Sequence, residues 1–235
     1  MVRCIPADEP ADFDQKVRKP GRAWLRKHRG RTVRPPPYWR QCNAQLAAAF
    51  EERCAYTAMF LGAPGTADHF VSIDENRALA YEWSNYRYAS AWINSRKQAL
   101  SSKELLDPFH IGKGWFELLL PSLQLCVSER CPSSQRAIAE NTLKALGLRD
   151  DERVLRYRRQ WLAEYECGDI DLDYLEKKAP LIAQAVRRWE EENGRPWGQP
   201  PPRPKRPRAR KSPAAKTSAR VKQSRRQGTR RGRSR

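Results

Sequence analysis

The stretch "GTADHFVSIDENRALAYEWSNYRYASAWINSRK", residues 65 to 97, decides how this chain is interpreted. It holds His69, one of only three histidines among 235 residues, directly after Asp68. Taken alone, an Asp-His dipeptide is far more often the solvated end of a strand than part of a catalytic site. The residues around it therefore determine which interpretation is favoured.

The pattern around the dipeptide predicts a hairpin, a loop and a helix, in that order. Aromatic and branched residues lie on both sides of Gly62, Pro64 and Gly65, which is typical of a hairpin turn. His69 is then expected near the end of the second strand. After a loop with a short extended piece, Ser84 is suited to cap a helix from residue 85 to about residue 97.

Asp68 and His69 are residue types that phosphodiester hydrolysis requires. Histidine has an unperturbed pKa of about 6.5, so it can deprotonate water near neutral pH. A carboxylate or amide oxygen can hold a hard divalent cation, which places positive charge on the phosphate. Adjacent strand residues point to opposite faces, so both can approach one phosphate only where the strand bulges or ends.

Two amides on the expected helix complete this set. Asn85 and Asn94 are nine residues apart, which places them on opposite faces of an ideal helix, so they are expected to do different jobs. Asn85 can hold backbone groups of the loop that carries His69. Asn94, further along the helix, can reach a metal ion beside Asp68.

The order of these residues resembles that of the HNH endonucleases. Asp68-His69, then WSNYR at residues 83–87 and NSRK at residues 94–97, follow the order of motifs that read roughly DHxxP, WxNLxxxC and CNxxK in that family, although the proline and the motif cysteines are absent here. The resemblance implies a ββα-metal motif in which His69 is the general base. It also implies that Asp68 and Asn94 bind Mg²⁺ or Mn²⁺. Asn85 would be the amide that constrains the loop.

A wider likeness covers roughly residues 37 to 190, and it is to a bacterial group of HNH-type proteins. It rests on segments such as CAYT at 54–57, LDPF at 106–109 and GWFELLLPSLQL at 114–125. Many HNH proteins brace the motif with zinc on two CxxC pairs, but here the four positions are Cys54, Thr57, Ser90 and Ile93. Because a structural zinc site needs about four ligands, no structural zinc is expected, and apolar packing should provide the brace.

Positive charge is concentrated at the two ends of the chain, which carries a formal net charge of +19. Residues 196–235 hold fifteen Lys and Arg, no acid and one branched aliphatic residue, so we expect a disordered basic tail that attracts polyanions. A tail that only aids solubility is the alternative. Residues 16–34 hold nine basic residues and no acid, and are expected to form an arm that ends at the three prolines 35–37.

Candidate nucleic-acid contacts also lie close to the proposed site. They are Arg87, Arg96 and Lys97, on or just beyond the expected helix, although such side chains on a helix are more often simply solvated. No apolar run approaches the ~20 residues that a membrane-spanning helix needs, so no membrane partner is expected. The six cysteines show no CxxC spacing, which favours free thiols and a cytoplasmic location.

The remaining patterns predict an α+β fold: a ββα-metal motif in a mostly helical domain, a small second hairpin and a C-terminal helical region. Expected elements are a helix over about 39–53 and two short strands joined at Pro121 and Ser122. Three helical segments follow; they end at Gly147, Gly168 and Gly194, and the last is broken near Pro180. The predicted organisation is a basic arm (1–36), an HNH-like domain (37–130), a helical region (131–195) and a tail (196–235).

These observations predict a metal-dependent endonuclease that hydrolyses DNA. Two other hypotheses remain open from the sequence. One is a nucleic-acid-binding protein that keeps the ββα shape without catalysis. The other is a nuclease directed at RNA.

Overall fold

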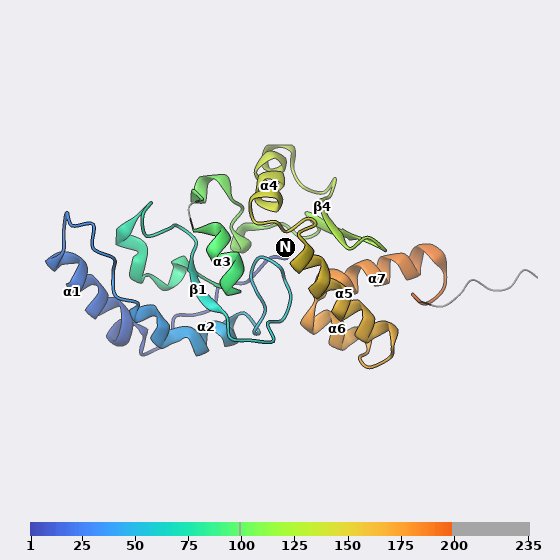
Figure 1. Ribbon diagram of the computed structural model, residues 1–235, viewed down its shortest axis with the longest axis horizontal. Helices are drawn as coiled ribbons and strands as arrows, with labels where there is room; N and C mark the ends of the chain where they lie inside the picture. Colours follow the sequence, from blue (N-terminus) through green and yellow to red (C-terminus); the bar gives the residue numbers. More distant parts are fainter. Residues whose placement is uncertain (99, 199–235) are drawn as a thin grey trace, which may run out of the picture. The chain divides into compact units, whose positions relative to one another are not determined.

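The computed structural model describes residues 1–98 and 100–198 and has a mixed α+β fold (Figure 1). Its strands form two antiparallel hairpins, as the α+β prediction requires. In chain order the elements are the π-helical turn η1 (Asp14–Arg18), α1 (Lys19–Lys27), the 3₁₀ helix η2 (Tyr38–Cys42), α2 (Asn43–Ala49), β1 (Thr66–His69), the 3₁₀ helices η3 (Arg77–Tyr81) and η4 (Trp83–Asn85), β2 (Tyr86–Ala89), α3 (Ala91–Lys97), the 3₁₀ helices η5 (Ser102–Glu104) and η6 (Pro108–His110), β3 (Phe116–Leu119), β4 (Gln124–Val127), α4 (Ser133–Ala145), α5 (Glu152–Glu166), α6 (Leu172–Lys178) and α7 (Pro180–Asn193).

The first hairpin joins β1 to β2, with Thr66 opposite Ala89 and His69 opposite Tyr86. The predicted pairing of β1 with the residues before Gly62 is wrong, because that segment turns back on itself through an Arg53–Phe60 bridge. The predicted helix start at residue 85 is also wrong. All four residues of β2 are buried and pair with β1, so a short strand occupies the start of the predicted helix, and α3 starts only at residue 91.

Gly65, just before β1, is required by the close approach of the two strands. Its N–H donates a hydrogen bond of 2.7 Å to the hydroxyl of Tyr88. A Cβ at this position would lie 2.6 Å from the Tyr88 ring and 2.9 Å from the backbone oxygen of Ala89. Both contacts are too short for a side chain, so the absence of one allows the buried tyrosine to cover the strand.

The second half of the chain agrees with the sequence patterns. The strands β3 and β4 pair on either side of Pro121, and the last helical segment divides at Pro180 into α6 and α7. Gly194 ends α7 in a left-handed conformation with φ of 63°, which glycine adopts without strain. Helix α7 packs on β3 and α4 packs on β4.

All six cysteines are free thiols, and Cys54 and Ile93 are fully buried in the core.

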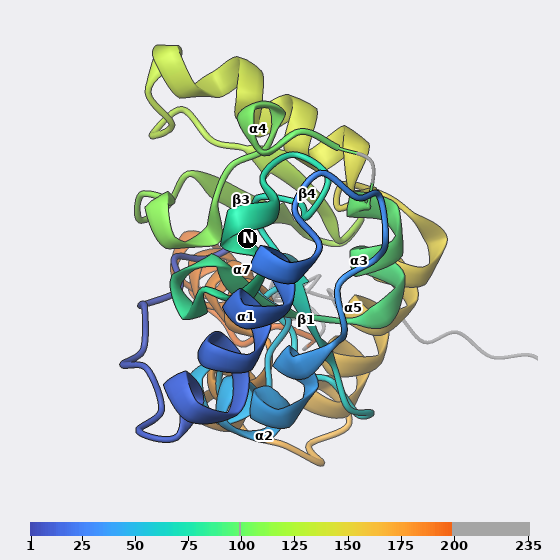
Figure 2. The same ribbon diagram turned by 90° about the vertical axis from the view of Figure 1, so that its left-hand side faces the viewer.

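The basic arm is folded onto the rest of this unit. Helix α1 packs against η3, and Gly21 lies so close to the ring of Tyr81 that a Cβ would come within 2.2 Å of it. Figure 2 draws α1 in front of β1. The described residues form one compact unit, which includes the arm and the predicted HNH-like and helical regions. Most of the predicted tail lies outside the described residues.

None of the helices in residues 1–98 and 100–198 is both long and apolar enough to cross a bilayer.

We expect Gly65→Ala to lower the free energy of unfolding by about 1–3 kcal/mol, because the added methyl group must displace a buried ring or backbone oxygen. Urea unfolding of the two proteins measures the difference. Gly62→Ala is the matched control, since nothing lies within 4 Å of a Cβ at that position. Equal stability of both variants would contradict the packing described for Gly65.

Candidate active site

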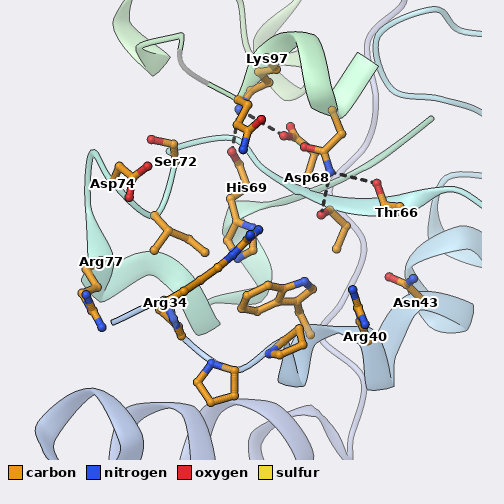
Figure 3. A pocket seen from close by; sticks show the side chains of 18 of the residues that line it. Arg34, Arg40, Asn43, Thr66, Asp68, His69, Ser72, Asp74, Arg77 and Lys97 are labelled. Carbon is orange, nitrogen blue, oxygen red and sulfur yellow. Dashed lines mark hydrogen bonds and ion pairs between the residues drawn. The ribbon is translucent and has the colours of Figure 1, made fainter. Parts of the chain in front are cut away.

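A pocket of about 800 Å³ opens beside the end of β1, between that strand, α3 and the chain that follows the basic arm (Figure 3). Asp68, His69 and Asn94 all line it, so the fold brings these three predicted site residues together. Strand β1 ends at His69, which is the condition under which two adjacent strand residues can serve one site. Asn85 does not line this pocket.

His69 is held in one orientation by the backbone and by aromatic rings. Its Nε2 donates a hydrogen bond of 2.9 Å to the carbonyl oxygen of Ala80. The ring meets Trp39 and Tyr86 edge to face, with centroids 4.6 and 5.0 Å apart. Because a carbonyl oxygen can only accept, the proton lies on Nε2 and Nδ1 keeps its lone pair.

The environment also keeps His69 neutral. Burial lowers the pKa of the imidazole below its usual 6.5, and this outweighs the opposing effects of the Ala80 carbonyl and the Asp68 carboxylate. A neutral imidazole with a free Nδ1 is the form that a general base requires.

Asp68 is almost fully enclosed, and its carboxylate has two partners. Oδ2 accepts a hydrogen bond of 2.5 Å from the hydroxyl of Tyr56, and Oδ1 lies 3.3 Å from Nζ of Lys97. Burial and the charge of Asp68 raise the pKa of Tyr56 well above its usual value of 10, so the phenol stays protonated and donates.

Lys97 is equally buried and joins α3 to the end of β1. Besides the ion pair with Asp68, its Nζ donates to the carbonyl oxygens of His69 at 2.7 Å and Phe70 at 2.9 Å. All three protons of the ammonium group therefore have acceptors. The predicted role of Lys97 as a phosphate contact does not agree with this placement.

Asn94 faces β1 from α3. Its Nδ2 donates to the hydroxyl of Thr66 at 3.0 Å and to the carbonyl oxygen of Ala67 at 3.5 Å. The Ala67 carbonyl can only accept, which fixes the orientation of the amide. Its Oδ1 accepts no hydrogen bond from any residue that the structure describes, so this oxygen is available within the pocket.

Asn85 binds the loop that follows His69, as the sequence led us to expect. Its Oδ1 accepts from the N–H of Val71 at 2.9 Å. Its Nδ2 donates to the carbonyl oxygens of Val71 and Leu79 at 2.9 and 3.2 Å. One amide thus holds both ends of the loop between β1 and η3. It does so from the end of the 3₁₀ helix η4 and not from α3.

The two arginines predicted to contact nucleic acid are also paired with acidic residues of the protein. Arg87 is 3% exposed and forms a two-pronged ion pair with Asp107, at 2.8 and 2.6 Å, beneath the ring of Phe109. Arg96 pairs with Asp151 at 2.5 Å and lies outside the pocket of His69. Both predictions relied on position near the site, and the acids that hold these arginines lie 20 and 55 residues further along the chain.

Two arginines that the sequence reasoning did not single out line the pocket instead. Arg34 and Arg40 are exposed, and neither has a side-chain hydrogen bond or ion pair with another described residue. In Figure 3 they lie on one side of His69, with Asp68 and Lys97 on the other. The sequence feature that could have identified Arg34 as a site residue is its place at the end of an acid-free basic segment, next to three prolines.

The oxygen donors of the pocket fit a weakly held divalent cation. Mg²⁺ commonly keeps several waters and takes only one or two protein ligands, and here the carboxylate of Asp68 and the free amide oxygen of Asn94 belong to residues that line the same space. The Asp68 carboxylate is shared with Lys97, which reduces the charge it offers to a cation. Among residues 1–98 and 100–198, no group of three or more His, Cys, Asp or Glu could hold a metal ion.

Comparison of the chain with protein-family models and with curated protein sequences gives no match.

Titration of the His69 ring by NMR should give a pKa below 6.5, because burial disfavours the charged form. The unfolded chain then binds this proton more tightly than the folded chain, so stability should fall as the pH drops below 6.5. His69→Gln assigns the resonance and should remove this part of the pH dependence. A pKa above 6.5 would contradict the environment described for the ring.

The buried pair of Asp68 and Lys97 should be strongly coupled. Lys97→Met leaves a carboxylate without its counter-charge, and we expect it to lower the free energy of unfolding by about 3–5 kcal/mol. The double variant with Asp68→Asn should recover at least ~1 kcal/mol of the summed losses in urea unfolding. The exposed pair Arg156 and Glu152 is the control, with an expected coupling below about 0.5 kcal/mol. A buried pair no more coupled than this one would contradict the prediction.

Proposed function

We propose that this chain is a metal-dependent endonuclease of the HNH type that hydrolyses phosphodiester bonds in DNA. The observation that carries the proposal is the sequence of hairpin β1–β2 and helix α3 around one pocket. It brings an oriented, neutral histidine together with a carboxylate and a free amide oxygen. The order and identity of these residues are those of the ββα-metal motif that the sequence resembles.

In this proposal His69 is the general base. Its Nδ1 accepts a proton from the water that attacks phosphorus, while the Nε2–H bond to Ala80 stabilises the imidazolium that forms. Asp68 and Asn94 would hold Mg²⁺ or Mn²⁺, which would supply positive charge to the phosphate and the leaving oxygen. Lys97 binds the backbone carbonyl of His69 itself, and Asn85 binds the backbone of Val71 in the loop that follows, so both position the base.

The ion pair between Lys97 and Asp68 favours a second candidate, a nucleic-acid-binding protein with the same fold and no metal. A buried ammonium 3.3 Å from the carboxylate already supplies the counter-charge that a cation would bring. Such a protein would bind DNA through its basic surfaces and leave it intact. The two candidates differ in their response to metal.

His69→Ala should abolish nicking of supercoiled plasmid in Mg²⁺ or Mn²⁺, because it removes the group proposed to take the proton from water. Binding to DNA should be unchanged, since the ring is only partly exposed and uncharged. Gel electrophoresis of the plasmid measures nicking. His110→Ala is the control, because this histidine is 82% exposed and lies outside the pocket.

Nicking by His69→Ala at the wild-type rate would contradict the assignment of the base. Cleavage that persists in excess chelator would contradict the role of the metal. Absence of cleavage by the wild type across Mg²⁺, Mn²⁺, Co²⁺ and Zn²⁺ would favour the second candidate.

A further inference from the structure

We propose that the basic arm and the adjacent helix η2 form the DNA-binding surface of this site, with Arg34 of the arm and Arg40 of η2 contacting the phosphates that enter the pocket. The proposal rests on the proposed function, and it names the group of residues that would hold the substrate. It replaces the contacts predicted from helix position, all three of which are already paired with groups of the protein itself.

The first argument is the balance of charge around the pocket. Its lining includes Arg34, Arg40 and Arg77, the buried pair of Asp68 with Lys97, and one exposed carboxylate, Asp74. Arg77 uses its guanidinium on backbone carbonyls of the arm. Arg34 and Arg40 are therefore the pocket arginines whose donors are free, among the residues that the structure describes. Guanidinium groups match phosphate oxygens in both charge and shape.

The second argument is that the arm is held firmly in place. Arg77 of η3 donates to the carbonyl oxygens of Arg31 and Val33, and the hydroxyl of Tyr81 donates to the carbonyl oxygen of Pro36 at 2.8 Å. The guanidinium of Arg77 also lies over the ring of Trp24 at 5.3 Å. A basic segment anchored at three points presents its charges at fixed positions, which lowers the ordering cost of binding.

The third argument is continuity between the arm and the catalytic site. The same short helix η3 that anchors the arm ends next to Ala80, whose carbonyl orients His69. Arg34 and His69 line the same pocket. Beyond Arg34, the exposed basic side chains of the arm extend the surface away from the pocket; they are Arg26, Lys27, Arg29 and Arg31.

The experiment measures binding of the full chain to a DNA duplex of mixed sequence in chelator, over a range of salt concentrations. Each phosphate contact contributes about −0.9 to the slope of log K against log salt. The double variant Arg34→Gln with Arg40→Gln should therefore flatten the slope by about 1.8 and weaken binding by about 10- to 30-fold at ~0.15 M salt. The charge-keeping variant with lysine at both positions should retain most of the slope.

The matched control is Arg130→Gln with Arg159→Gln. Both residues are exposed, lie outside the pocket and have no side-chain partner among the described residues, so the loss of formal charge is identical. This control should change the slope and the affinity much less. An equal effect of the two double variants, or wild-type binding by the variant at residues 34 and 40, would overturn the proposal.

The two proposals fail in different ways. Absence of nicking by the wild type in any metal would defeat the nuclease and leave the binding result unaffected. Nicking by the wild type together with unchanged binding and nicking by the Arg34 and Arg40 variant would defeat the binding surface and leave the nuclease standing.

Discussion

The buried ammonium group of Lys97 is the interaction on which the arrangement of the site depends. It comes from the last turn of α3, and its three protons go to the Asp68 carboxylate and to the carbonyls of His69 and Phe70. A charged group at 2% exposure is tolerated only when it is fully paired. Helix α3 and the end of β1 are thereby tied together, so Asn94 on the helix must face the strand that carries Asp68 and His69.

The helix η3 is the second organising element, because contacts from three directions meet on its short backbone. The carbonyl of Ala80 accepts from both His69 and the hydroxyl of Tyr86, at 2.9 and 2.8 Å. The carbonyl of Leu79 accepts from Asn85. On its other side Tyr81 packs on Gly21 of the arm. The contacts of the arm and of His69 therefore meet on adjacent residues of one short helix.

The sequence allowed prediction of the residue types of the site better than their surroundings. Asp68, His69 and Asn94 line one pocket, and Asn85 binds the loop. Short polar side chains beside the end of a strand can reach only the groups next to it in space, so residue type and spacing are informative there. The start of α3 could not be predicted, since β2 is only four residues long and is defined by its pairing with β1, which is a tertiary contact. The pairing of Arg87 with Asp107 depends on tertiary contact, which local spacing does not encode.

The separation of buried from exposed charge explains why the arm matters to this site. Inside the pocket, Lys97 cancels the charge of Asp68, so the buried groups provide little net attraction for a phosphate. Attraction at longer range must come from unpaired exposed cations, and their effect is strongest where a hollow surface excludes water. Arg34 and Arg40 meet both conditions. Arg22 of α1 is exposed but does not meet them, because it is paired with Glu82. In the proposed complex, a phosphate held by Arg34 and Arg40 would therefore lie in the pocket that His69 lines.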